Sequence, residues 1–221
     1  MRRVAGGLSC LVLVAGLPLA CGTSAGYDNG GNGGEPCKDV VEGYPCRPYG
    51  QDIHDRVTNL TFYHPTTGAA VRLSDYLVDK TSERADKVFI ITSFAEWCGV
   101  CHAEAPQIYS VYKDLRDRGA ELLMTVNQDS NRSEKVADII AAAGRWEDDA
   151  LGGVQLDEHF VGVLADTDRF LNVFYDVSAT PMNMIVGSDF KIYYKFTGWE
   201  GENKFRNMVE GIIENSLESG D

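Results

Sequence analysis

Residues 87–101 read KVFIITSFAEWCGVC, and this stretch decides the fold. Its first part, KVFIITSF, is a continuous apolar run of the kind expected for a central strand buried on both faces of a sheet. Cys98 and Cys101 follow this strand directly. A helix is expected next and to end at Gly119, because apolar side chains then recur at helical spacing, at Ala105, Ile108, Val111, Tyr112 and Leu115.

This placement favours a reactive thiolate at Cys98. The first N–H groups of a helix have no partner within it and the helix dipole is positive there, so a thiolate is stabilised. Cys101, about one turn further on, is expected to be more shielded, which leaves Cys98 as the nucleophile. With two intervening residues the sulfurs can close a reversible disulfide. The predicted reaction is attack by Cys98 on a substrate disulfide and resolution by Cys101, and it requires no metal and no organic cofactor.

The remainder of the sequence predicts alternating strands and helices, then a hairpin and a terminal helix. This order is typical of an α/β fold with a mixed central sheet and helices on both faces. The expected elements are an N-terminal extension of two strands at 57–62 and 69–73, a helical turn at 73–78, a strand at 121–127, a helix at 133–143 with Gly144 just past its end, a loop at 145–160, a strand at 161–166, a short helix at 169–177, strands at 182–187 and 191–198, and a closing helix at 202–217.

Residues 1–20 have the layout of an export signal, with Arg2 and Arg3 ahead of an uncharged apolar run that Pro18 interrupts. An integral membrane anchor fits less well, because a spanning helix needs ~20 unbroken apolar residues. Residues 21–57 are expected to be a tether, whose Gly- and Asn-rich beginning has almost no large apolar side chains. Residues 58–221 are then expected to form the folded domain.

Three further cysteines lie in or near this tether. Cys21 follows the small residue Ala20, which resembles a bacterial lipoprotein box, although Pro18 departs from the usual pattern. Lipidation of Cys21 and simple cleavage near Ala20 or Ala25 both remain open. Cys37 and Cys46 are candidates for a structural disulfide in an oxidising compartment. Unpaired surface thiols are the alternative, and a metal role is weaker because neither His54 nor His64 has zinc-finger spacing.

The charge of the chain argues against nucleic-acid binding. Its formal net charge is −13, and a field of that sign repels phosphate backbones. Loss of Arg2 and Arg3 with the leader makes the mature chain still more acidic.

The motif around the cysteines resembles a known family. Trp97-Cys98-Gly99-Val100-Cys101, followed by Glu104 and Pro106, is similar to the WCxxC…E.P signature of TlpA/ResA-type thiol-disulfide reductases in the thioredoxin superfamily. The resemblance runs from about Thr58 to the C-terminus and implies a thioredoxin-like fold. Val100 departs from it, replacing a proline common between the two cysteines.

The resemblance also assigns roles to residues outside the dithiol. Tyr175-Asp176-Val177 before Thr180-Pro181 is similar to the stretch whose proline is cis and faces the dithiol, although Met182 replaces a threonine often found after it. Thr180 is then expected to offer its backbone to an extended substrate segment, and Pro181 to shape that site. Gly198 resembles the glycine that ends the last strand.

Three residues beside the cysteines complete the expected site. Glu104 corresponds to a glutamate that acts on the proton of the resolving thiol, and a shielded carboxyl there has a raised pKa. A solvated helix-surface acid is the alternative. Trp97 is expected either to pack as a lid on the dithiol or to contact substrate, and Glu96 is expected to be exposed.

The function implied is an exported, periplasmic or cell-envelope reductase of disulfides in exported proteins, recharged by a membrane electron donor. Two alternatives use the same cysteines. A copper-delivery module would bind Cu(I) through the two thiolates near His102. A c-type haem protein would use Cys98, Cys101 and His102 as a CxxCH motif, but the preceding apolar strand and the Thr180-Pro181 element do not suit it.

Overall fold

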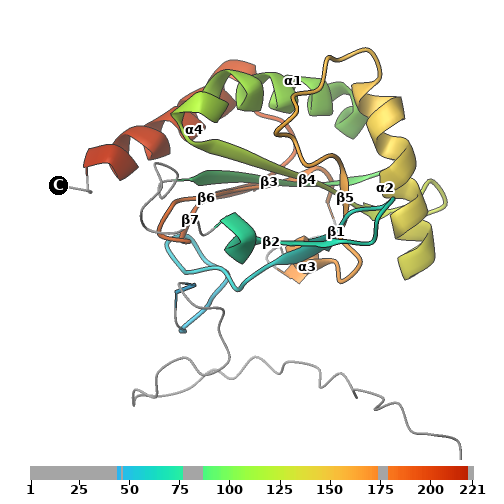
Figure 1. Ribbon diagram of the computed structural model, residues 1–221, viewed down its shortest axis with the longest axis horizontal. Coiled ribbons are helices and arrows are strands. Elements are labelled where there is room, and N and C mark those ends of the chain that lie inside the picture. The colour runs from blue at the N-terminus through green and yellow to red at the C-terminus, as the bar shows by residue number, and fades with distance from the viewer. Residues whose placement is uncertain (1–43, 46, 77–86, 174–178, 219–221) are drawn as a thin grey trace, which may run out of the picture. The chain divides into compact units, whose positions relative to one another are not determined.

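The computed structural model describes residues 44–45, 47–76, 87–173 and 179–218 (Figure 1). The chain divides into two compact units, Met1–Glu35 and Pro36–Asp221, and all the described residues belong to the second. The predictions for the leader, Cys21, Cys37, Cys46 and the Tyr175–Val177 stretch lie outside the described residues. No helix among the residues described is long and apolar enough to cross a membrane.

The second unit is built on a seven-stranded mixed sheet in the order β2-β1-β5-β4-β3-β6-β7. The pairs β3/β4 and β4/β5 are parallel, whereas β1, β2, β6 and β7 join the sheet antiparallel to their neighbours. The strands are β1 (Thr61–Tyr63), β2 (Ala70–Arg72), β3 (Val88–Ala95), β4 (Ala120–Gln128), β5 (Leu164–Ala165), β6 (Met182–Val186) and β7 (Ile192–Thr197).

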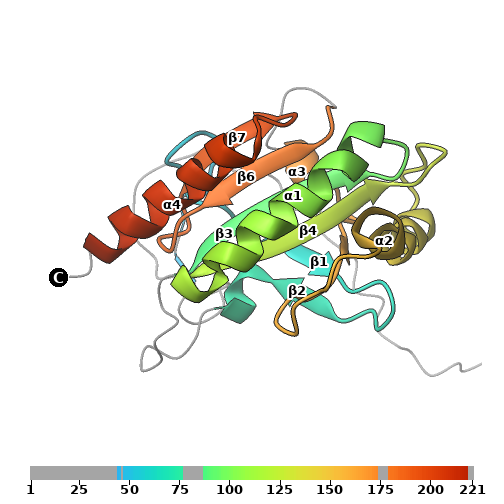
Figure 2. The same ribbon diagram turned by 90° about the horizontal axis from the view of Figure 1, so that it is seen from above.

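Helices lie on both faces of this sheet, as the sequence predicts. The elements are η1 (Leu73–Tyr76), α1 (Gly99–Leu115), η2 (Arg116–Arg118), α2 (Val136–Leu151), α3 (Phe170–Val173) and α4 (Glu202–Glu218). Helices α1 and α4 lie side by side over one face, and the short elements η1 and α3 lie on the other (Figures 1 and 2). Gly119 ends η2 in a left-handed conformation with φ 108°, which glycine adopts without steric cost.

The central strand β3 explains why the domain has two apolar layers. All eight of its residues are buried. Because strand side chains alternate between faces, Val88, Ile90 and Phe94 join the core beneath α1, α2 and α4, whereas Phe89 and Ile91 join the core of the opposite face. Because β3 ends at Ala95 and α1 begins at Gly99, Cys98 lies just beyond the carboxyl end of the central strand.

The second helix is longer than expected. The prediction that it stops before Gly144, with a loop from residue 145, is wrong, because α2 continues to Leu151. Gly144 is exposed, and beyond it Trp146, Ala150 and Leu151 are buried at helical spacing. Burial of these side chains outweighs the roughly 1 kcal/mol by which a helical glycine is less favourable than alanine.

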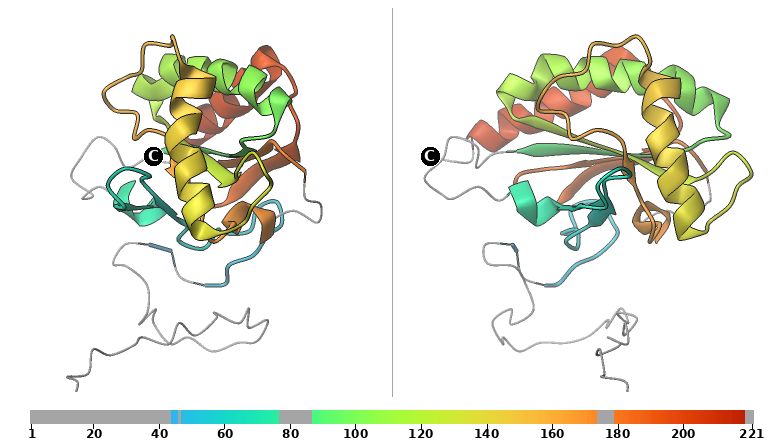
Figure 3. Two further views of the ribbon diagram at one scale, coloured as in Figure 1. Left: turned by 90° about the vertical axis from the view of Figure 1, so that its right-hand side faces the viewer. Right: turned by 45° about the vertical axis from the view of Figure 1, so that its right-hand side comes forward.

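After α2, residues 152–163 run alongside α1 before they enter β5 (Figure 3). The Asp157 N–H donates to the Tyr109 hydroxyl of α1, Arg116 forms an ion pair with Asp157, and the Phe160 ring packs on Tyr109 at 5.2 Å between centroids. The segment therefore covers the outer side of α1. The strand expected at 161–166 is reduced to the two residues of β5.

The packed part of the domain begins before residue 58. Tyr44 is only 4% exposed, its ring lies 4.6 Å from that of Phe190, and its hydroxyl donates to the carbonyl oxygens of Val57 and Thr58. Residues between Tyr44 and Val57, which the sequence assigned to the tether, thus contribute to the core beneath the sheet.

Candidate functional site

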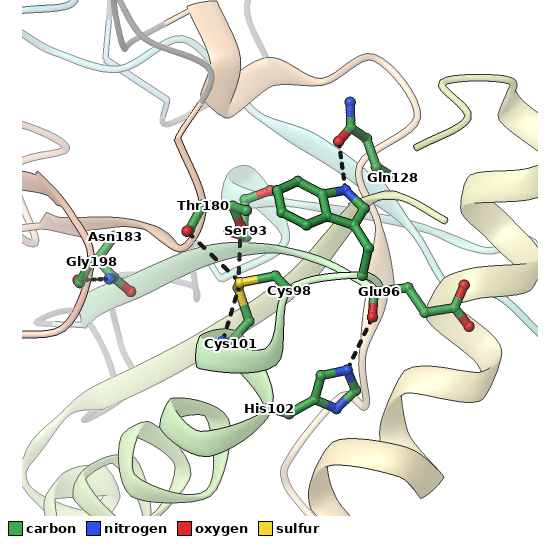
Figure 4. The surroundings of a disulfide bond; sticks show 10 residues. Ser93, Glu96, Cys98, Cys101, His102, Gln128, Thr180, Asn183 and Gly198 are labelled. Atoms are coloured by element: carbon green, nitrogen blue, oxygen red, sulfur yellow. Dashed lines mark hydrogen bonds between the residues drawn. A yellow bond between two sulfur atoms is a disulfide. The ribbon is translucent and has the colours of Figure 1, made fainter. Parts of the chain in front are cut away.

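Cys98 and Cys101 form a disulfide at the start of α1, with their Cα atoms 5.2 Å apart (Figure 4). Cys98 is the N-cap of the helix, and its Sγ accepts a hydrogen bond from the Cys101 N–H at 3.2 Å. Cys98 is 5% exposed, whereas Cys101 is fully buried. Cys101 is therefore the more shielded of the two residues, as predicted, and the free N–H groups at the helix start favour a thiolate on Cys98 once the bond is reduced.

Thr180 faces both sulfurs from the loop that leads into β6 (Figure 4). Cys98 Sγ lies 3.8 Å from the Thr180 carbonyl oxygen, and Cys101 Sγ lies 3.3 Å from Thr180 Oγ1. The same hydroxyl is 3.3 Å from the carbonyl oxygen of Ser93. Neither sulfur of a disulfide carries a hydrogen and the hydroxyl has only one, so in this state Thr180 Oγ1 donates either to the Ser93 carbonyl oxygen or to Cys101 Sγ, and not to both at once.

The Thr180–Pro181 peptide bond is cis, as the resemblance implies. Its position beside the disulfide brings together residues about 80 positions apart in the chain. The structure thus places Cys98, Cys101, Thr180 and Pro181 in one site.

Glu104 is buried in α1, only 2% exposed, on the helix side that also buries Cys101, Ala105 and Ile108. Neither carboxylate oxygen has a hydrogen-bond partner among the described residues. Removal from water disfavours the charged form, and burial raises the pKa of Glu104 to about 7. The alternative of a solvated surface acid is therefore wrong, and this carboxyl can exchange a proton near neutral pH.

Trp97 is 37% exposed and is held from two sides. Its indole N–H donates to Gln128 Oε1 at 3.0 Å, and the guanidinium carbon of Arg132 lies 4.3 Å from the centroid of its ring. Gln128 is itself bound, because its Nε2 donates to Glu134 at 3.0 Å. Trp97 thus presents a fixed aromatic surface beside the disulfide, and no sequence pattern predicts the residues that hold it.

The prediction that Glu96 is exposed is wrong, because its side chain is only 9% accessible. Its carboxylate accepts two hydrogen bonds from Arg145 of α2, at 2.6 and 2.8 Å, and one from the Ser130 N–H at 2.8 Å. The bonds from Arg145 are the main reason that the pKa of Glu96 lies below its ordinary value. This ion pair fastens the turn before Cys98 to α2, and it escaped the sequence reasoning because the partners are 49 residues apart.

His102 points to the turn before Cys98 and away from the sulfurs (Figure 4). Its Nε2 lies 3.1 Å from the Glu96 carbonyl oxygen, and its ring centroid lies 4.2 Å from that of Trp146. A carbonyl oxygen only accepts, so Nε2 carries the hydrogen in this contact. His102 and both cysteine sulfurs are thus engaged within the protein. Among the described residues there is also no group of three or more His, Cys, Asp or Glu side chains placed to hold a metal ion.

Residues 53–195 match the model of the AhpC/TSA family. No curated protein matches the sequence significantly. Among solved structures, the chain is similar to a thioredoxin-family thiol:disulfide interchange protein from Chlorobium tepidum, with 17% identity, a TM-score of 0.52, and coverage of 76% of this chain and 99% of the other. The pneumococcal exposed lipoprotein thioredoxin from Streptococcus pneumoniae has 19% identity and a TM-score of 0.51, over 70% and 99% of the two chains. A thiol:disulfide interchange protein from Bacteroides sp. has 16% identity and a TM-score of 0.52, over 76% and 95%. At these identities the likeness establishes a shared thioredoxin-like fold.

Proposed function

The chain belongs to the AhpC/TSA family, and on this premise we propose that it is an exported protein-disulfide reductase that acts through Cys98 and Cys101. It is a thiol-disulfide oxidoreductase, and the observation that carries this function is the disulfide at the N-terminus of α1, with the cis Thr180–Pro181 bond beside it. The proposal adds the direction of the reaction and the compartment.

In the proposed reaction the reduced Cys98 thiolate attacks one sulfur of a client disulfide. A bond forms between Cys98 and the client, the client S–S bond breaks, and the second client sulfur leaves as a thiolate. The Cys101 thiolate then attacks Cys98 Sγ and releases the first client sulfur. Two electrons pass to the client, and Cys98–Cys101 becomes the disulfide seen here.

Glu104 is proposed to take the proton of the Cys101 thiol before this second attack. Its burial supports the role, since a carboxyl whose pKa is about 7 is poised to accept a proton near neutral pH. Thr180 is proposed to contact the client segment through its backbone, Pro181 to shape that contact, and Trp97 to form its edge. The 37% exposure of Trp97 favours a client contact over a closed lid.

The leader-like residues 1–20 and the Gly- and Asn-rich stretch that follows them support export to the periplasm or cell envelope. Lipidation of Cys21 and a disulfide between Cys37 and Cys46 are parts of the same proposal. In an oxidising compartment the dithiol needs a dedicated reductant, for which we propose a membrane dithiol protein that transfers two electrons to Cys98–Cys101.

The reduction potential of the Cys98/Cys101 pair tests the direction of the reaction. Equilibration with glutathione or dithiothreitol buffers should give a value near the thioredoxin figure of about −270 mV, whereas one near −120 mV would indicate an oxidase. Reduced protein should also reduce insulin, and the Cys98→Ser variant should not. A protein with a reversible disulfide but no activity on insulin or disulfide peptides would contradict the proposal.

A further inference from the structure

Arg132 places an exposed positive charge beside the redox-active disulfide. Its guanidinium carbon lies 4.3 Å from the ring centroid of Trp97, the residue immediately before Cys98. The salt bridges of the described residues do not include Arg132. The guanidinium is therefore positioned by a cation–π contact with Trp97 and not by an ion pair with a carboxylate.

Five of the nine arginines in the described part of the chain form ion pairs, and Arg132 is not among them. The chain is acidic overall, with 33 acidic and 20 basic residues. Near the site, Arg145 pairs with Glu96 and Arg169 pairs with Glu134. Further away, the paired arginines are Arg116, Arg118 and Arg206. Arg132 thus keeps an unneutralised charge where client disulfides must approach.

The loop that carries Arg132 has a defined conformation. Arg132 has φ 63°, in the left-handed region that residues other than glycine seldom adopt. Asp129 closes the loop, because its Oδ1 accepts hydrogen bonds from the N–H groups of Asn131 and Ser133 at 2.9 and 2.6 Å. Trp97 is also fixed, by its hydrogen bond to Gln128. A ligand that binds Arg132 would therefore lose little binding free energy to the ordering of side chains and loop.

A guanidinium that rests on a ring keeps N–H donors at its edge for another partner. These donors form a planar fork that matches a carboxylate and can bind it through two parallel hydrogen bonds. We propose that Arg132 binds the carboxylate of an Asp or Glu side chain adjacent to the disulfide of the client polypeptide. This inference rests on the proposed function and specifies its substrate class: clients with an acidic residue next to the cystine are favoured.

The test must separate this local contact from the field of an acidic protein, which slows the approach of any acidic client. Two disulfide peptides of identical composition meet this need, one with Glu next to the cystine and one with the same Glu moved six residues away. The rate constant for reduction by the reduced protein should be about 3-fold higher for the first, a value typical of an exposed ion pair. The ratio should fall towards 1 when salt is raised, because exposed charges are screened.

Three variants identify the residue responsible. The ratio of the two rate constants should fall to 1 in Arg132→Gln, and Arg132→Lys should retain part of the preference. Arg72→Gln is the matched control, because Arg72 is also exposed and forms no ion pair with another described residue, but lies on β2, at the far edge of the sheet. It should keep the full ratio.

The outcomes also separate this inference from the proposed function. Equal rates for the two peptides in the parent protein, or an undiminished ratio in Arg132→Gln, would overturn the role of Arg132 and leave the reductase intact. Failure to reduce either peptide or insulin would instead remove the reductase. Should Arg132→Gln fold poorly, a partial ratio in Arg132→Lys beside the full ratio in Arg72→Gln still identifies Arg132.

Discussion

The carbonyl oxygen of Thr180 lies 3.8 Å from Cys98 Sγ, although 82 residues separate the two in the chain. The side chain of the same threonine reaches the other sulfur, with its hydroxyl 3.3 Å from Cys101 Sγ. Thr180 thus contacts the attacking cysteine through its backbone and the resolving cysteine through its side chain. Substitution of the side chain should affect only the second of the two chemical steps.

Thr180→Val should slow resolution by Cys101. A reduced Cys101 thiolate would lose the hydroxyl that hydrogen-bonds it, and a hydrogen bond to a charged group contributes about 1.5 to 3 kcal/mol. We expect the release of client from the mixed disulfide to slow by at least about 10-fold, with the attack by Cys98 unchanged, in single-turnover measurements. Thr180→Ser keeps the hydroxyl and should behave like the parent. Equal slowing of both steps would show a general distortion of the site.

The unequal exposure of the cysteines predicts which variant traps a client. In Cys101→Ser, Cys98 can still attack but the mixed disulfide has no internal thiol to resolve it. A covalent adduct with a disulfide peptide should accumulate and be visible by intact-protein mass spectrometry, whereas Cys98→Ser should give none. An adduct on Cys101 in the Cys98→Ser protein would show that the fully buried sulfur is accessible.

Glu104 should make the domain less stable as the pH rises. Its pKa is about 7 in the folded protein against an ordinary value of 4.5, so the folded state holds the proton more tightly. The contribution of the protonated carboxyl is complete below about pH 4.5 and is lost as the pH rises through 7. The loss is on the order of 3 kcal/mol, from the 1.36 kcal/mol that one pKa unit represents.

Glu104→Gln should remove this pH dependence. Urea unfolding of the oxidised protein should give a higher free energy of unfolding for the variant than for the parent at pH 8, and a smaller difference at pH 4.5. Glu158→Gln makes the same charge change at a side chain that is 88% exposed and should follow the parent curve. A parent protein whose stability does not fall between these pH values would contradict the raised pKa. In the reduced protein, Glu104→Gln should also slow resolution by Cys101.

His102 should stabilise the turn before Cys98 without taking part in the redox chemistry. His102→Phe keeps a ring against Trp146 but loses the hydrogen bond to the Glu96 carbonyl, so the free energy of unfolding should fall by about 1 kcal/mol. His102→Ala should lose more, because the ring contact also disappears. His159→Phe, at a side chain that is 50% exposed, is the control. Unchanged stability in both His102 variants would show that these contacts contribute nothing.

The sequence predicted the centre of the fold because local periodicity governs it. The run at residues 87–94 is mostly apolar, and the strand it predicts is buried on both faces. The helix after Cys98 follows from the spacing of its buried residues, and its C-terminal region ends at Gly119 as predicted. The cysteine spacing and the adjoining helix start were sufficient to predict the disulfide.

The features that local pattern could not supply depend on tertiary contacts. The family resemblance singles out Glu104, but its burial depends on how α1 packs on the sheet. The environment of Glu96 depends on Arg145, and that of Trp97 on Gln128 and Arg132, all from elements more than 25 residues away. The extension of α2 through Gly144 does not follow from local pattern, because a glycine favours the end of a helix and only the packing of Trp146, Ala150 and Leu151 outweighs it.

The backbone that precedes β1 has a further effect on the behaviour of the domain. The N–H groups of His54 and Val57 donate to the carbonyl oxygens of Ile192 and Phe190, and the Ile192 N–H donates to Asp55. These hydrogen bonds cover the beginning of the outer edge of β7, the last strand of the sheet. An uncovered edge strand would leave its backbone N–H and C=O groups free to pair with a second molecule. Removal of residues 44–57 should therefore promote self-association and aggregation through the exposed edge of β7.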